Sequence, residues 1–167
     1  EITKACVEMG KVKTGALIVI EKKESLQAYE RTGIEVDGIV TSQLLINIFE
    51  HNTPLHDGAV LIRGNRVTYA TCYLPLSDNL GLSKELGTRH RAGVGISEAV
   101  DALTVMVSEE TGGISIAYEG ELERNLNADR LKEKIRQIMN MNGEEDAKGR
   151  HWREGKSRKK GEKEASK

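Results

Sequence analysis

Residues 55–59, Leu-His-Asp-Gly-Ala, place an imidazole beside a carboxylate immediately before an apolar run. In a regular strand the side chains of His56 and Asp57 would point to opposite faces, so they can serve one site only from the loop before the strand. Gly58 would let a ligand approach the backbone closely. The carboxylate supplies an acid, and the imidazole suits a metal ion. A plain Asx-type turn after Pro54 is the alternative interpretation.

A second segment carries Thr88, Arg89, His90 and Arg91 where a helix is expected to begin, with Thr88 as its predicted N-cap. Cations at a helix N-terminus oppose the macrodipole, so helix stability does not explain them. Free backbone N–H groups and two guanidiniums would suit a phosphate chain. Because helical residues two apart point about 200° from each other, the two arginines converge only if the first turn is irregular or the ligand spans the helix end. A solvated basic turn is the alternative.

Three further polar segments join regular elements, where a scaffold usually carries its site. In residues 108–113 a carboxylate could hold a divalent cation together with a phosphate, or the segment could be a capped hairpin turn. Tyr73 follows a strand and offers a flat face for a base, although a buried core tyrosine is the alternative. Residues 14–17, Thr-Gly-Ala-Leu, lack the spacing of a Walker loop or a dinucleotide fingerprint. Together the segments favour nucleotidyl or phosphoryl transfer.

The elements that must position these segments follow from hydrophobic periodicity. Strands are predicted at residues 15–20, 34–40, 59–63, 67–73, 103–108 and 114–118. Helical segments are predicted at residues 2–10, 25–31, from 41 or 42 to the Asn-Thr-Pro of 52–54, 88–99, and from 128 onward with Asn127 as the cap. Residues 77–86 are predicted to form a polar loop. The chain should therefore be a layered α/β (α+β) protein, with a central mixed, twisted sheet of about six or seven strands flanked by about five helices.

Composition excludes several classes of protein. The longest clean apolar stretch, Ala16–Ile20, is far shorter than the roughly 20 residues of a membrane helix. Two cysteines, Cys6 and Cys72, do not make a disulfide scaffold and are predicted to be reduced, buried thiols. Aromatic residues are only 4% of the 167 residues, which argues against an aromatic-stacking RNA-binding sheet.

The C-terminal part of the chain differs in charge from the rest. Residues 144–167 hold nine Lys or Arg and six Asp or Glu, with Trp152 as their one large apolar residue. Such a segment cannot bury a core of its own, so we expect one domain over residues 1–140 and a charged, disordered tail over 141–167. The alternative for the tail is contact with an anionic membrane or with nucleic acid.

Asp57-Gly58-Ala59 together with Arg89-His90-Arg91 resembles the paired signature of the diadenylate cyclase domain family. The resemblance covers roughly residues 1–140, with matching flanks at residues 14–21, 41–63, 86–98 and 102–116. The helix-to-strand opening is similar to that of the membrane-anchored type, in which transmembrane helices precede the domain. The resemblance thus implies a cytoplasmic catalytic domain whose parent protein is anchored in the cell membrane by N-terminal helices absent from this chain.

The resemblance implies condensation of two ATP into cyclic di-AMP, a second messenger, with release of two pyrophosphates. It also implies a divalent metal ion, Mn²⁺, Co²⁺ or Mg²⁺. Carried over by motif, Asp57 activates the ribose 3′-hydroxyl, while Arg89 and Arg91 hold the phosphates. His56 and Glu110 are the implied metal contacts. The other implied nucleotide-binding residues are Gly58, Ala59, Thr88, His90, Ser108, Tyr73 and Leu17.

The implied reaction makes a demand on assembly. Each new bond joins the 3′-oxygen of one ATP to the α-phosphorus of the other, so two nucleotides must face each other. One domain of this size has room for one such pocket, and a face-to-face homodimer is the simplest solution. A non-catalytic nucleotide-binding module that signals by dimerising is the alternative function, and a nucleic-acid-associated protein using the basic tail is a third. No nucleic-acid partner is expected, and regulatory protein partners cannot be read from the sequence.

Overall fold

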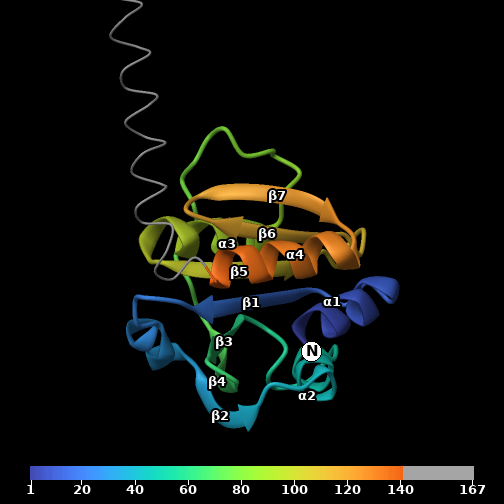
Figure 1. The fold of residues 1–167 in the computed structure, drawn as a ribbon, viewed down its shortest axis with the longest axis vertical. Coiled ribbons are helices and arrows are strands. Elements are labelled where there is room, and N and C mark those ends of the chain that lie inside the picture. The colour runs from blue at the N-terminus through green and yellow to red at the C-terminus, as the bar shows by residue number, and fades with distance from the viewer. Residues whose placement is uncertain (141–167) are drawn as a thin grey trace, which may run out of the picture. The chain divides into compact units, whose positions relative to one another are not determined.

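The structure is a computed structural model that describes residues 1–140, and the expectations for residues 141–167 lie outside the described residues. A seven-stranded sheet runs through the domain in the order β2-β4-β3-β1-β5-β6-β7 (Figure 1). Its strands are β1 (Ala16–Glu21), β2 (Ile34–Ile39), β3 (Ala59–Arg63), β4 (Arg66–Cys72), β5 (Ala102–Val107), β6 (Ile114–Tyr118) and β7 (Glu121–Leu126). Strands β1 and β3 run parallel, whereas every other neighbouring pair of these seven is antiparallel. The mixed sheet predicted from the sequence is confirmed.

Strands β1 and β5 form the buried centre of the sheet. Strands β1 and β5 pair along their whole length, from Ala16 opposite Val107 to Glu21 opposite Ala102. Every residue of β5, and all of β1 except Glu21, is buried. Continuous apolar runs are typical of strands covered on both faces, which is the environment that these two occupy.

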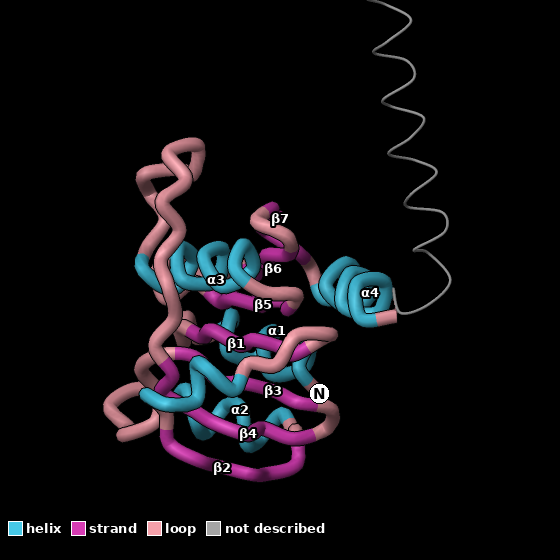
Figure 2. The backbone as a smooth tube through the Cα atoms, turned by 90° about the vertical axis from the view of Figure 1, so that its left-hand side faces the viewer, coloured by secondary structure: helices cyan, strands magenta, loops and turns pink. Residues whose placement is uncertain are grey.

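Four α-helices and one 3₁₀ helix accompany the sheet within residues 1–140, in line with the predicted number. They are α1 (Ile2–Lys11), the 3₁₀ helix η1 (Gln27–Thr32), α2 (Ser42–Phe49), α3 (Thr88–Ala99) and α4 (Ala128–Met139). Figure 2 shows α3 and the beginning of α4 on opposite sides of β5 and β6. No helix among the described residues is both long and apolar enough to cross a bilayer.

The helix caps agree with the sequence at two places and differ at one. Thr41 Oγ1 accepts a hydrogen bond from the Leu44 amide at 3.1 Å, and Asn127 Oδ1 accepts one from the Arg130 amide at 2.8 Å. The predicted N-cap at Thr88 is wrong. Gly87 occupies that position with an extended backbone and no side-chain hydrogen bond, so Thr88 becomes the first helical residue. The first turn of α3 therefore keeps amide groups that no capping side chain satisfies.

The cysteine prediction is confirmed, because both Cys6 and Cys72 are buried free thiols. Burial raises the pKa of each thiol to about 12, so neither forms a reactive thiolate near neutral pH.

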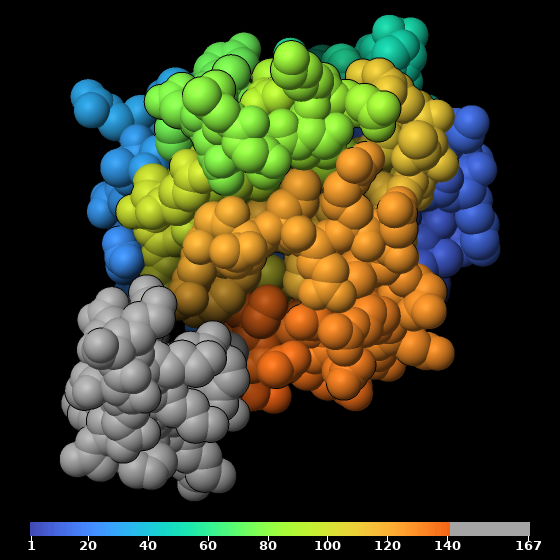
Figure 3. Space-filling model, turned by 90° about the horizontal axis from the view of Figure 1, so that it is seen from above, coloured from blue at the N-terminus to red at the C-terminus, as the bar shows by residue number. Residues whose placement is uncertain are grey.

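The connection from β4 to α3, residues 73–87, is the long loop at the top of Figure 1. It was predicted as a polar loop over residues 77–86, and no helix or strand lies within it. In the space-filling view of Figure 3 the loop, in green, lies exposed at the surface. It carries the three exposed apolar side chains Tyr73, Leu76 and Leu80.

Candidate functional site

A cleft of about 620 Å³ opens where the β3, α3 and β5 segments meet. Its walls come from the loop before β3, the loop after β4, the first turn of α3, the turn after β5, and β7. Ten residues proposed from the sequence line it: Leu17, His56, Asp57, Gly58, Tyr73, Thr88, Arg89, His90, Ser108 and Glu110. Two others, Ala59 and Arg91, are not among the lining residues. The structure thus brings together five polar segments that are far apart in the sequence.

His56 and Asp57 both lie in the loop before β3, which begins at Ala59. This is the arrangement in which the two side chains can serve one site. His56 Nδ1 lies 2.7 Å from the backbone carbonyl oxygen of Thr53. Since a carbonyl only accepts, Nδ1 carries the proton and donates, which leaves Nε2 of the neutral ring with a free lone pair. A backbone carbonyl behind Nδ1 is a common way to orient a metal-binding histidine.

Gly58 is a glycine for two physical reasons. Its φ of +83° lies in the left-handed region, where a Cβ is costly. A Cβ there would also lie 2.8 Å from the carbonyl carbon of Thr71 in β4. The loop therefore approaches β4 closely, and Gly58 donates its amide to Asp57 Oδ1 at 3.1 Å. The Asp57 carboxylate is exposed at the cleft and has free acceptor capacity.

The two arginines of α3 diverge, because the first turn of this helix is regular. Arg89 lies in the cleft, where its Nη1 forms an ion pair with Glu109 Oε2 at 3.1 Å. Arg91 instead donates from Nη2 to the carbonyl oxygen of Ser83 at 3.3 Å. One arginine therefore faces the cleft and the other ties the 73–87 loop to the helix.

His90 is a buried member of the cleft wall, 8% exposed. Burial is the main cause that lowers its pKa below the ordinary value, and the positive charges of Arg124 and Arg89 act in the same direction. The imidazole is therefore neutral near pH 7 and supports the cleft without adding a cation. Ala59, the remaining residue of the first motif, is fully buried where β3 begins and pairs with Cys72.

The turn after β5 is stabilised by its own hydrogen bonds and also lines the cleft. Ser108 Oγ accepts hydrogen bonds from the amides of Glu110 and Thr111, each at 3.2 Å. This is the capped turn considered as the alternative for the segment, and it also leaves the exposed Glu110 carboxylate at the cleft. No group of three or more His, Cys, Asp or Glu within residues 1–140 is arranged to hold a metal. An imidazole from His56 and a carboxylate from Glu110 would fit a divalent ion that takes its remaining ligands from phosphate oxygens and water.

Tyr73 is 67% exposed on the rim of the cleft, so the buried-core alternative for this tyrosine is wrong. Its amide donates to Thr32 Oγ1 at 2.9 Å, which fixes the start of the loop. Buried Leu17 and Cys72, with half-buried Leu74, supply apolar surface on the same cleft. A flat ring beside an apolar floor suits a nucleobase.

Sequence reasoning missed part of the wall. Glu109 and Arg124 both line the cleft. Glu109 belongs to a segment that the sequence singled out, and its pairing with a distant arginine left no local signal. Arg124 lies on β7, a strand that the hydrophobic pattern did not predict.

The chain is similar in sequence to a known protein family and to several of its members. Residues 3–122 match the family described as DisA bacterial checkpoint controller nucleotide-binding, abbreviated DAC. The chain is 51% identical over 153 residues to the cyclic di-AMP synthase CdaA of Bacillus subtilis, covering 91% of this chain and 56% of that protein. It is 48% identical over 157 residues to a diadenylate cyclase of Listeria monocytogenes, covering 93% of this chain and 58% of that protein. The chain thus spans little more than half the length of these relatives.

Two solved structures share the fold. A double mutant of DacA from Staphylococcus aureus superposes with a TM-score of 0.81 at 49% identity, covering 83% of this chain and 92% of that one. A structure described as a hypothetical membrane spanning protein from Bacillus cereus gives a TM-score of 0.73 at 45% identity, covering 75% and 62% of the two chains. The family match covers both motifs and every cleft-lining residue except Arg124. The chain therefore belongs to the DisA bacterial checkpoint controller nucleotide-binding family, the diadenylate cyclase domain family that its two motifs resemble.

Proposed function

We propose that this domain is a diadenylate cyclase that joins two ATP molecules into cyclic di-AMP. The observation that carries the proposal is the placement of Asp57 and Arg89 in one cleft, from the loop before β3 and the first turn of α3. An acid for a hydroxyl and a guanidinium for a phosphate are the two groups that this condensation needs most. Relatives that cover most of this chain are named diadenylate cyclase or cyclic di-AMP synthase, which supports the same activity here.

In the proposed reaction the ribose 3′-oxygen of one ATP attacks the α-phosphorus of the other, and the bond to pyrophosphate breaks. Asp57 orients the 3′-hydroxyl and accepts its proton, while Arg89 neutralises charge on the phosphates and on the leaving pyrophosphate. The uncapped amides at the start of α3, with Thr88 at the rim, offer further donors to the phosphates. Two such displacements close the ring and release two pyrophosphates.

The proposed metal contacts are His56 and Glu110, for Mn²⁺, Co²⁺ or Mg²⁺. A divalent ion at this place would supply charge neutralisation at the phosphates. His56 would act through Nε2, since its Nδ1 is engaged with the Thr53 carbonyl. Glu110 offers a solvent-exposed carboxylate on the same cleft. The remaining proposed nucleotide contacts are Tyr73 and Leu17 at the base, Gly58 and Ala59 at the ribose, and Ser108 and His90 near the phosphates.

A cleft of about 620 Å³ suits one nucleotide, whereas the product contains two. We therefore propose a homodimer in which two clefts face each other and each subunit holds one ATP. Because the whole proteins to which the chain is similar are longer, and one structural relative is described as membrane spanning, we propose that the parent protein is membrane-anchored with this domain in the cytoplasm.

The test is to incubate the protein with ATP and Mn²⁺ and to identify the nucleotide product by chromatography. We expect cyclic di-AMP and two pyrophosphates for each product formed. Asp57→Asn should lower cyclisation by about 10²-fold or more while ATP still binds, within the range for loss of a general base. Asp129→Asn, which removes an equal charge at the exposed start of α4, is the matched control and should leave the rate unchanged. ATP binding without any product from the wild-type protein would instead support the non-catalytic binding module.

The roles of Arg89 and Arg91 can be distinguished by comparing how each substitution affects the binding of ATP and of adenosine. Arg89→Ala should weaken ATP binding much more than adenosine binding, because its guanidinium faces the cleft. Arg91 was predicted from the motif as a second phosphate ligand, and that role stays a proposal. If Arg91→Ala weakens adenosine and ATP equally, Arg91 acts through the loop that it holds at Ser83.

A further inference from the structure

Arg89 lies against a glycine that leaves room for its guanidinium. Gly15 joins α1 to β1, and a Cβ built on it would lie 2.6 Å from Arg89 Nη1 and 2.8 Å from Arg89 Cζ. The next nearest atom is Glu109 Cβ at 3.1 Å. All three neighbours are side-chain atoms of the same ion pair. The Arg89–Glu109 ion pair therefore occupies the space that a side chain at position 15 would need.

Glu109 fixes one end of the guanidinium. Its Oε2 lies 3.1 Å from Arg89 Nη1, with the arginine side chain 23% exposed and the glutamate side chain 63% exposed. Arg89 Nε is buried and has no hydrogen-bond partner within the part of the chain that the structure describes. A guanidinium has five N–H donors, four of them on its two terminal nitrogens, so pairing at Nη1 leaves further terminal N–H groups for a ligand.

If Gly15 and Glu109 did not confine it, the Arg89 side chain would have room to turn away from the cleft. Arg89 also borders a second cavity of about 490 Å³, which is lined by Gly15, His51, His56 and Glu109 among others. A long, flexible side chain between two open spaces adopts several rotamers unless something holds it. At this boundary Glu109 forms an ion pair with the guanidinium, and Gly15 lies directly beside it.

We propose that Gly15 and Glu109 are positioning residues that hold the Arg89 guanidinium ready for the phosphates of ATP. The proposal rests on the proposed function, since it takes Arg89 to be a phosphate ligand. Gly15 provides the space and Glu109 provides the counter-charge, so the arginine is ordered before the nucleotide arrives. Pre-organised contacts of this kind strengthen binding because less freedom is lost when the ligand binds.

Gly15→Ala tests the space directly. Its backbone is not in the left-handed region, and the three atoms nearest to the added methyl group belong to the side chains of Arg89 and Glu109, which can move. Because these nearest atoms belong to movable side chains, the fold should tolerate the change, with a Tm close to that of the wild type. We expect ATP to bind about 10-fold more weakly, the scale of one charge-assisted hydrogen bond, while adenosine binding stays the same. Gly81→Ala is the matched control, because its methyl group would lie 3.1 Å from another movable polar atom, Asn79 Oδ1, away from the cleft lining.

A double-mutant cycle with Arg89→Ala decides whether Gly15 acts through the arginine. In the Arg89→Ala background, Gly15→Ala should change the Kd for ATP by less than about 2-fold. An equal loss of about 10-fold in both backgrounds would overturn the proposal, since the methyl group would then be acting elsewhere.

Glu109→Gln tests the counter-charge, because it keeps the shape and removes the charge. We expect weaker ATP binding in the wild-type background and no further change in Arg89→Ala. Tighter ATP binding in Glu109→Gln would show that the carboxylate competes with phosphate, and would overturn the proposal. These are binding measurements with ATP, so their outcome is separate from cyclisation. Coupled Kd values without any cyclic product would refute the proposed function and leave the positioning role intact.

Discussion

Replacing Gly95 with alanine should displace the loop after β4, which forms one wall of the cleft. Gly95 lies in α3 against the loop that follows β4, and a Cβ on it would overlap the carbonyl oxygen of Pro75. The same Cβ would lie 2.8 Å from the amide nitrogen of Ser77 and 2.9 Å from the carbonyl carbon of Pro75. All three are backbone atoms, so no side-chain rotation relieves the contact. The loop itself must retreat until ordinary contact begins at 3.4 Å.

The size of the effect follows from how the loop is fastened. Ser77 donates its amide to the Arg91 carbonyl oxygen at 3.0 Å and its hydroxyl to Glu98 Oε1 at 2.6 Å. Retreat weakens at least one of these bonds, at about 1 kcal/mol each, and overpacking adds about 1–3 kcal/mol. The gain in helix propensity from glycine to alanine is about 1 kcal/mol. The net loss is therefore about 1–3 kcal/mol, which lowers Tm by roughly 3–10 °C in a domain of this size.

Thermal unfolding and ATP kinetics measure the two consequences. We expect a lower Tm and a higher KM for ATP, because Tyr73 and Leu74 of the same loop line the cleft. Gly93→Ala is the matched control in the same helix. Its methyl group would meet side-chain atoms of Met106 and Thr104, and the flexible methionine can adapt. If Gly95→Ala instead raises Tm by the propensity gain and leaves KM unchanged, the backbone contact does not constrain the loop and the reasoning fails.

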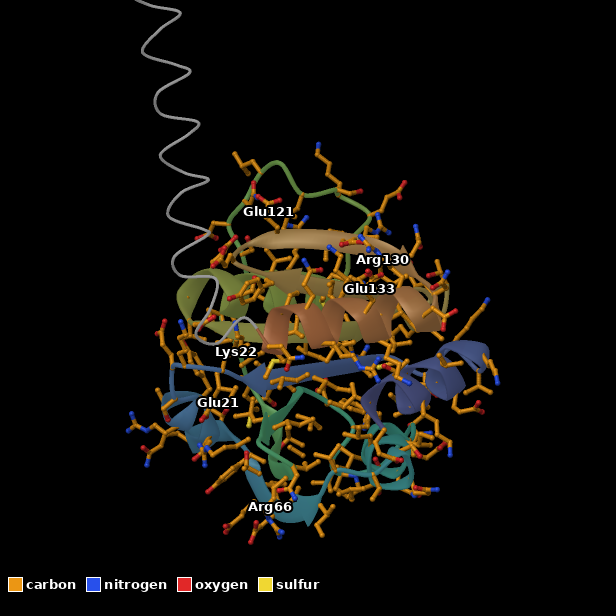
Figure 4. All side chains as sticks on the ribbon, viewed as in Figure 1. Glu21, Lys22, Arg66, Glu121, Arg130 and Glu133 are labelled. Atoms are coloured by element: carbon orange, nitrogen blue, oxygen red, sulfur yellow. The ribbon has the colours of Figure 1, made fainter. Side chains whose placement is uncertain are left out.

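Three further predictions concern stability. Gly58→Ala should cost about 1–2 kcal/mol for its positive φ, plus the contact with the β4 backbone, and an unchanged urea midpoint would contradict this. Lys22 directly follows β1 (Figure 4). Tyr118→Phe should cost about 1–3 kcal/mol by thermal unfolding, because the hydroxyl accepts from Lys22 Nζ and donates to Asp101 Oδ1, each at 2.9 Å. A Tm equal to that of the wild type would refute that role. Since burial lowers the pKa of His90, the unfolded chain binds more protons between that pKa and about 6.5. Stability should fall in this window as the pH falls, by at most about 1.4 kcal/mol per pH unit, and His90→Gln should remove this slope; parallel curves for the two proteins would count against it.

The central part of the fold could be predicted because its signals are local. Strands β1 and β5 are continuous apolar runs, and the sheet buries them on both faces. Strand β7 was not predicted, although it completes the sheet and brings Arg124 to the cleft. Its sequence, Glu-Leu-Glu-Arg-Asn-Leu, is mostly charged or polar, and only Leu126 is buried. Pairing with β6 across the Glu119-Gly120 turn makes it a strand, and that tertiary cause leaves a weak local pattern.

In the candidate site, too, some features follow from local sequence and others depend on long-range contacts. The loop position of His56 and Asp57 could be predicted because the side-chain alternation of a strand permits no other shared site. The N-cap could not be assigned between two adjacent residues, since glycine in an extended conformation begins a helix nearly as well as threonine. The ion pair between Arg89 and Glu109 depends on the space beside Gly15, which only the folded chain reveals. Long-range contacts of this kind decide how a motif is used.

The second motif illustrates the point, because its two arginines have different surroundings: Arg89 lines the cleft, whereas Arg91 is not among the cleft-lining residues. A regular first turn in α3 sends Arg89 into the cleft and Arg91 to the Ser83 carbonyl. The loop that Arg91 holds is also fastened at Ser77 and lies against Gly95, so three contacts from one helix position the wall that carries Tyr73. Arg89 instead forms an ion pair with Glu109 of the turn after β5 and lies beside Gly15, which precedes β1. The helix therefore links the proposed phosphate end of the cleft to its proposed base-binding wall, and a shift of α3 would alter both at once.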